Sequence, residues 1–287
     1  MTGITLDDIL QTINEPVSDL PLKTIIDAYF DGTKHMHDFG HEVMIPQLKA
    51  LLGPTTEEIA IRDIYFKMYL FLGSAMTMNR LDHFQSVAAL TRSLFELLLD
   101  MKILAADKTG DAVNRYNEFP EIERYRRAEQ LIAFDASHPN QIKQDLSAQR
   151  AFIADPARQV RVASAIGTKR KYPDHWTRMN ARERARNAGE EAVYVEVYAL
   201  LSWYVHVGAA GTTGMSKDAL ESMFGVCHGL IRRIFLQAIE ICAKATKISE
   251  LAEFKGWMTS LETKTAEIIV NEQRKLLDAK RAEPAPP

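Results

Sequence analysis

The chain has 287 residues, of which 46% are hydrophobic and 25% are charged, and its formal net charge is −3. These values are typical of a globular protein with a sizeable core. The negative net charge excludes attraction of the whole surface to nucleic acid or to an anionic membrane, although a local basic patch is compatible with it. The longest apolar run, residues 192–205, contains Glu196 and is shorter than the ~20 residues that span a bilayer, so we expect no membrane partner.

Two features of the sequence predict a cytoplasmic location. The N-terminus is acidic where a secretory leader would be basic and then apolar. Cys227 and Cys242 lie fifteen residues apart on one predicted helix. That separation is about 22 Å along the axis, too far for a disulfide within the helix. A reducing compartment is the simplest explanation of this cysteine usage.

Helical periodicity runs through the whole chain, and no segment shows convincing strand alternation. We predict an all-α fold, a multi-helix bundle with two central buried helices that carry a polar cluster. The predicted units, in chain order, are an N-terminal helical segment (1–54), a helical bundle core (55–247), a C-terminal helix (248–280) and a disordered tail (281–287).

Within the core, acidic residues after Thr55 mark a helix start. From there helix is predicted to about residue 106, with a break near residues 73–78 that makes a hairpin of two long helices. A loop is predicted near Pro173, and a second buried helix from about Arg182 to Val207.

Two of these helical segments, residues 87–100 and 194–206, are apolar on nearly every face, and each carries a short polar stripe at helical spacing. A helix that is hydrophobic all round is buried, and a buried charge must be paired. We therefore expect the polar residues of the two helices to be partners inside the protein. They are Arg92 and Glu96 on the first helix, and Tyr198, Ser202 and His206 on the second.

These residues support two interpretations. The first is a structural network in which Arg92 pairs with Glu96 and the others complete the hydrogen bonds. The second is an active site. There His206 acts as general acid or base, Glu96 orients it or shares its proton, and Arg92 stabilises charge on a phosphate. Tyr198 and Ser202 are then positioning hydrogen-bond donors.

Residues 157–186 carry nine basic side chains against two acidic ones, with aromatic residues between them. Basic and aromatic residues together suit a nucleic-acid backbone and its stacked bases. The alternative interpretation is a solvated charged surface. The predicted nucleic-acid contacts are Lys169, Arg170, Lys171, Trp176, Arg178 and Arg182.

A second histidine cluster consists of His35, His37 and His41. His37 and His41 are four residues apart and can share a metal on one helical face. The glutamate of the His-Glu-x-x-His protease motif is missing. A surface cluster is the preferred interpretation, and we predict no metal site and no cofactor.

The order and spacing of several motifs resemble those of a bacterial family of unknown function, DUF5677. The resemblance covers roughly residues 60–245 and implies a helical fold without assigning an activity. Gly189 stands where that family tends to place a glycine, before the buried helix. The other matching residues are Arg92 and Glu96, the pair His175-Trp176, and Tyr198, Ser202 and His206.

The helical arrangement is also similar to that of the HEPN superfamily, whose members often act as metal-independent ribonucleases in bacterial toxin and anti-phage systems. HEPN nucleases carry Arg-x4–6-His on one helix. Arg170 and His175 have this spacing, but Pro173 argues against a continuous helix between them. His206 has no arginine at the required distance, so Arg92 would have to replace it from another helix. The resemblance implies a homodimer.

The leading hypothesis is a protein that binds RNA or cleaves it without a metal, in defence or stress response. The alternative is a non-catalytic protein-interaction module whose buried polar cluster fixes helix register. A third hypothesis is small-molecule binding in the bundle core.

Overall fold

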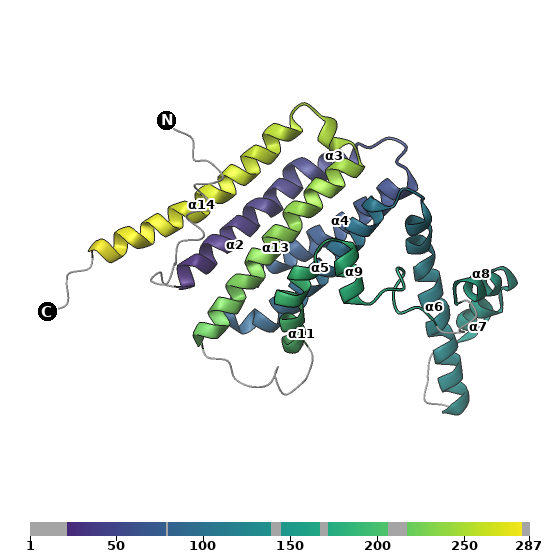
Figure 1. Cartoon of the computed structure of the whole chain (residues 1–287). Helices are drawn as coiled ribbons and strands as arrows, with labels where there is room; N and C mark the ends of the chain where they lie inside the picture. Colours follow the sequence, from purple (N-terminus) through teal and green to yellow (C-terminus); the bar gives the residue numbers. More distant parts are fainter. Residues whose placement is uncertain (1–21, 79, 139–144, 167–171, 206–216, 283–287) are drawn as a thin grey trace.

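The computed structural model of the chain describes residues 22–78, 80–138, 145–166, 172–205 and 217–282, which form helices and turns without a strand (Figure 1). The predicted all-α bundle is thereby confirmed. The elements are α2 (Leu22–Phe39), a π-helical turn η1 (Gly40–Met44), α3 (Ile45–Lys49), α4 (Thr56–Ala75), a 3₁₀ turn η2 (Leu81–His83), α5 (Phe84–Ala106), α6 (Asp111–Ser137), α7 (Ser147–Ala154), α8 (Pro156–Ile166), α9 (Ala181–Asn187), α10 (Glu191–Val193), a π-helical turn η3 (Tyr194–Tyr198), α11 (Ala199–Val205), α13 (Lys217–Ala245), a 3₁₀ turn η4 (Ile248–Glu250) and α14 (Phe254–Ala282).

Helix α5 lies at the centre of the bundle, where it packs against α4, α11 and α13. Four of its leucines, Leu94, Leu98, Leu99 and Leu104, are at most 1% exposed. In α13 the buried residues Cys227, Ile231 and Phe235 recur every four positions, which places them on one face toward the core. Both cysteines are free, and burial raises the pKa of each thiol to about 12.

Helices α2, α13 and α14 run side by side along one side of the bundle (Figure 1). In contrast, α6 leads away from the bundle, and α7 and α8 pack together near its far part. Two arginines, Arg124 and Arg158, lie over the ring of Phe152 in this outer region, at 4.4 and 3.8 Å from its centroid. Arg158 also bonds to Glu121 of α6, which ties α8 to α6.

The predicted continuous helix 182–207 is wrong, because the chain turns sharply after α9. Gly189 adopts a positive φ of 71°, a conformation that L-residues with a side chain rarely adopt, and helix resumes at Glu191. Beside it, buried Glu190 bonds to Lys102 of α5 and, at 3.1 Å, to Arg233 of α13. These ion pairs hold the turn against two core helices.

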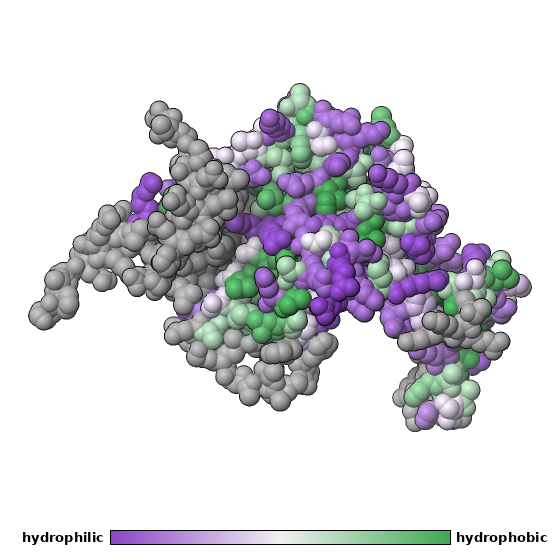
Figure 2. Space-filling model, in the orientation of Figure 1, coloured by the Kyte–Doolittle hydropathy of each residue, from purple (hydrophilic) through white to green (hydrophobic). Residues whose placement is uncertain are grey.

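The segment η3–α11 packs against α5 with one face and leaves its other face exposed. Tyr198 and Leu201 are buried, whereas Val195 is 55% exposed. Over the face shown in Figure 2, hydrophilic residues cover much of the described surface, with hydrophobic areas between them. Among the described residues, no helix is both long and apolar enough to cross a membrane.

Candidate functional site

Helix α5 presents three ionisable side chains along one face. Arg92, Glu96 and Asp100 are four residues apart, so they lie one above another on successive turns. The Arg92 Nε lies 3.3 Å from Glu96 Oε1, the i,i+4 pair that the sequence predicted. Most of the other residues of α5 are apolar, and many of them are buried, so these side chains are polar groups set into a largely hydrophobic helix.

Tyr198 reaches this face from the π-helical turn η3. Its hydroxyl donates to Glu96 Oε1 at 2.6 Å and accepts from Arg92 Nε at 2.9 Å. Burial, followed by the hydrogen bond to Glu96, raises the pKa of Tyr198 to about 12. The phenol is therefore a neutral donor near pH 7. The sequence predicted that the polar stripes of the two apolar helices contact each other, and Tyr198 makes that contact.

Arg184 joins the same face from α9. A capping box between Asn180 and Glu183 fixes the start of this short helix. One turn later the Arg184 side chain, only 6% exposed, bridges both carboxylates of α5. Its Nη2 lies 3.4 Å from Glu96 Oε2 and its Nη1 lies 3.2 Å from Asp100 Oδ1.

His175 completes the group from the turn that precedes α9. The main-chain N–H of Thr177 donates to His175 Nδ1 at 3.2 Å. At the other nitrogen of the ring, His175 Nε2 lies 3.3 Å from Asp100 Oδ1. Arg184 Nη1 lies 3.1 Å from the same Nε2. Backbone and carboxylate together fix the orientation of the imidazole.

We call this group the α5 cluster; it consists of Arg92, Glu96, Asp100, His175, Arg184 and Tyr198. Two guanidinium groups balance two carboxylates, so the cluster is formally neutral when the imidazole is neutral. The side chains of Glu96, Arg92 and His175 are 33%, 24% and 20% exposed. The cluster therefore has an accessible edge around a buried arginine. It combines a carboxylate, an imidazole and a cation, which suits proton transfer beside a phosphate.

Two of the predicted catalytic residues are not part of this cluster as the structure describes it. Ser202 donates its hydroxyl to the main-chain oxygen of Tyr198 at 2.9 Å, a hydrogen bond within its own helical segment. His206 lies outside the described residues. Among the described residues, the imidazole that joins this cluster is that of His175, which contacts Asp100 and Arg184.

Acids from outside segment 157–186 neutralise much of its positive charge. Arg182 and Arg186 both bond to Glu191, and Arg158 and Arg161 both bond to Glu121. Sequence counting overstates the charge because it counts only the acids within the segment.

The predicted nucleic-acid contacts have different environments. Arg178 is exposed, although its Nη2 donates to the Ala165 carbonyl at 2.7 Å. Trp176 is 4% exposed and packs edge-on against Tyr116, so it is part of the core rather than an open stacking surface. Lys169, Arg170 and Lys171 lie outside the described residues.

Sequence reasoning missed three members of the cluster as site residues: Asp100, His175 and Arg184. Asp100 continues the spacing of Arg92 and Glu96, and that periodicity is the signal that would have found it. The pair His175-Trp176 was noted only for its family resemblance. Arg184 resembles its exposed neighbours in sequence, and nothing in the sequence distinguishes it.

The histidines His37, near the end of α2, and His41, in η1, both contact Tyr69. The His37 ring stacks on Tyr69 at 4.7 Å, and His41 Nδ1 lies 3.4 Å from the Tyr69 hydroxyl. In the part of the chain that the structure describes, no group of three or more His, Cys, Asp or Glu side chains is arranged to hold a metal ion.

Comparison with known proteins gives one match. The model of a family of unknown function, DUF5677, matches residues 58–219, a little more than half of the 287 residues. The matched segment contains every member of the α5 cluster. Neither a curated protein nor a solved structure matches the chain.

Proposed function

We propose that this chain, which belongs to the family of unknown function DUF5677, cleaves RNA without a metal ion at the α5 cluster. The observation that carries the proposal is the bridge made by Arg184. It holds the carboxylate of Glu96 and the imidazole of His175 on either side of one guanidinium group. Both of these acid–base groups are partly exposed to a substrate.

The chemistry is an internal transesterification. The ribose 2′-hydroxyl attacks the adjacent phosphorus, the bond to the 5′-oxygen breaks, and the products are a 2′,3′-cyclic phosphate and a 5′-hydroxyl. Glu96 accepts the proton of the 2′-hydroxyl, and protonated His175 donates one to the leaving 5′-oxygen. Arg92, the more exposed of the two arginines, stabilises negative charge on the phosphate.

The remaining members position these groups. Asp100 and the Thr177 main chain fix the His175 ring, and Tyr198 donates to Glu96. Such fixed geometry lowers the cost of reorganisation during the reaction. In this proposal His175 takes the acid–base role that the sequence suggested for His206.

The similarity to HEPN ribonucleases supports the same reaction class, with one difference. HEPN nucleases place arginine and histidine on one helix, whereas here His175 lies in a turn and the arginines come from α5 and α9. A homodimer and a role in defence or stress response, which that similarity implies, are parts of the proposal.

A second candidate is a non-catalytic interaction module. It is favoured by the charge balance of the cluster, since each carboxylate is already paired with an arginine. In this case the network fixes how α5, α9 and η3 pack, and its partial exposure has no chemical consequence.

The test is cleavage of an end-labelled RNA pool in excess chelator. We expect the wild type to produce 2′,3′-cyclic phosphate ends, and His175→Asn to cleave about 10²- to 10⁴-fold more slowly. The matched control is His138→Asn, which changes an exposed histidine at the end of α6. We expect wild-type cleavage from this control.

Glu96→Gln provides a second variant, because its amide oxygen can still accept from Tyr198. Thermal unfolding shows whether each variant is folded. Absence of cleavage by the folded wild type would contradict the ribonuclease and favour the interaction module. Cleavage by a folded His175→Asn at the wild-type rate would remove His175 from the mechanism.

A further inference from the structure

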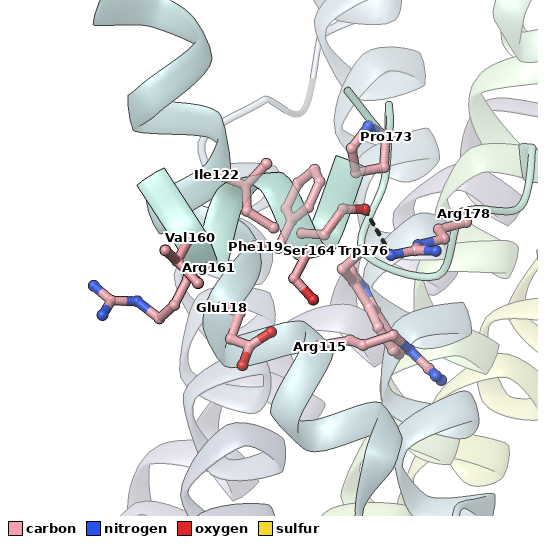
Figure 3. A pocket seen from close by; sticks show the side chains of 11 residues that line it. Arg115, Glu118, Phe119, Ile122, Val160, Arg161, Ser164, Pro173, Trp176 and Arg178 are labelled. Atoms are coloured by element: carbon pink, nitrogen blue, oxygen red, sulfur yellow. Dashed lines mark hydrogen bonds between the residues drawn. The ribbon is translucent and has the colours of Figure 1, made fainter. Parts of the chain in front are cut away.

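A pocket of about 380 Å³ lies next to the α5 cluster, between α6, α8 and residues 173–178 (Figure 3). Phe119 and Ile122 from α6 and Trp176 form apolar parts of its wall. Trp176 is held edge-on by Tyr116, and its buried indole N–H has no hydrogen-bond partner. The pocket therefore has an apolar wall, and one residue of that wall carries a donor that a hydrogen-bond acceptor on a ligand can satisfy.

The polar lining of the pocket is mainly cationic. Three arginines contribute to it against one acid, Glu118. Arg161 is already paired with Glu121, and Arg178 donates to a main-chain carbonyl and so retains its full charge. Arg115 is exposed and forms no ion pair with any described residue. An apolar wall below unpaired guanidinium groups fits a ligand with a planar ring and an anionic group.

The pocket and the α5 cluster share a wall. The Phe119 and Trp176 rings lie 6.1 and 5.7 Å from the His175 ring, centroid to centroid. Both rings also line the pocket. A ring bound in the pocket is thus separated from the imidazole by a single layer of side chains.

We propose that this pocket is a nucleobase subsite. One base of the RNA lies against the apolar wall of the pocket, and its phosphate is held at the rim by Arg115 and Arg178. This inference rests on the proposed ribonuclease function for its biological role. Binding to the pocket, however, requires no catalysis and is measured separately.

The experiment is calorimetric titration of the full chain with the four ribonucleoside 5′-monophosphates. Ribose 5-phosphate, which lacks the base, and adenosine, which lacks the phosphate, are the comparison ligands. We expect at least one nucleotide to bind, and both comparison ligands to bind about tenfold more weakly or not at all. Equal binding of ribose 5-phosphate would overturn the base subsite and leave an anion site alone.

Variants locate the binding. Arg115→Gln removes a rim charge at an exposed position, and Trp176→Phe removes the N–H while keeping an aromatic ring. We expect each to weaken nucleotide binding about 5- to 10-fold, as for the loss of one charged contact or hydrogen bond. Arg127→Gln, at an exposed position of α6 outside the pocket, is the matched control and should bind as the wild type does. Unchanged binding by Arg115→Gln would overturn the proposal even if Trp176→Phe fails to fold.

Failure of the subsite and failure of the proposed function give different results. Nucleotide binding without RNA cleavage supports the pocket and contradicts the ribonuclease. RNA cleavage without nucleotide binding supports the ribonuclease and contradicts the nucleobase subsite. His175→Asn should retain nucleotide binding, because its ring lies behind the pocket wall and does not line it.

Discussion

Two histidines of this bundle, His175 and His228, have opposite environments. His228 lies in α13 with no exposed surface, packed against Phe30 and Phe224 with ring centroids 5.8 and 4.9 Å away. Neither of its ring nitrogens has a hydrogen-bond partner in the described structure. His175 is partly exposed and has polar neighbours at both nitrogens, including Asp100.

The difference shows what makes a histidine chemically useful in a helical protein. Burial lowers the pKa of His228 to about 4, so near neutral pH its ring is a neutral core aromatic. A main-chain N–H and a carboxylate lie beside the two ring nitrogens of His175 and fix the orientation of its ring, and the side chain is 20% exposed. Burial within a hydrophobic bundle therefore does not make a histidine chemically useful. The polar groups that contact the ring decide whether it is an acid–base group or part of the core.

The largest effect is expected at Arg184. Arg184→Met leaves Glu96 and Asp100 side by side without their shared cation, and we expect the free energy of unfolding to fall by roughly 3–5 kcal/mol. Arg186→Met, two residues along the same helix, breaks a solvent-exposed pair with Glu191 and should have a much smaller effect on the free energy of unfolding. Chemical denaturation measures both. Similar losses would mean that the α5 cluster behaves like surface ion pairs.

An intermediate effect is expected from the titration of His228, which makes the free energy of unfolding depend on pH. Its folded-state pKa of about 4 lies below the ordinary value of 6.5, so on acidification the unfolded chain takes up the proton first. The contribution of this group to the free energy of unfolding is fully present above the pKa of His228 in the unfolded chain. It is lost as the pH falls toward the pKa of His228 in the folded chain. The loss should be about 2 kcal/mol between about pH 7.5 and about pH 5.

The variant His228→Phe removes this titration, and its unfolding free energy should depend less on pH over the same range. His138→Phe, at an exposed position, should keep the wild-type slope. Denaturant titrations at each pH provide the measurement. If His228→Phe keeps the wild-type slope, the loss at low pH comes from other groups.

The smallest effect is expected at Tyr198. Tyr198→Phe keeps the ring but removes the donor to Glu96, and should lower the free energy of unfolding by about 1–2 kcal/mol. Tyr194→Phe, which changes the stacked ring one turn earlier, is the control and should be near neutral. Equal stability of Tyr198→Phe and the wild type would show that the hydrogen bond adds nothing to stability.

Local patterns in the sequence predicted much of the fold. The apolar residues of α5 recur at helical spacing, and Thr55 with Glu58 makes the capping box that begins α4. The break between α9 and α10 was not predicted. It depends on a glycine at positive φ and on ion pairs of Glu190 with distant helices, which local periodicity does not reveal.

Part of the candidate site was also predictable. Arg92 and Glu96 stand out as charges on a buried helix, and Tyr198 stands out on the next apolar helix. The basic segment was harder to interpret, because the acids that neutralise it, Glu121 and Glu191, lie outside its limits.

Residue spacing within each helix was enough to predict the all-helical class, the helix that carries the cluster, and three of the six cluster members, because these features depend on local periodicity. The folded arrangement was needed to show that Arg184, 84 residues from Asp100, is the arginine that contacts it, and that His175 supplies the imidazole. The physical reason is that pairing between distant elements depends on where turns direct each helix. Neighbouring arginines with the same local pattern, such as Arg184 and Arg186, therefore have different environments.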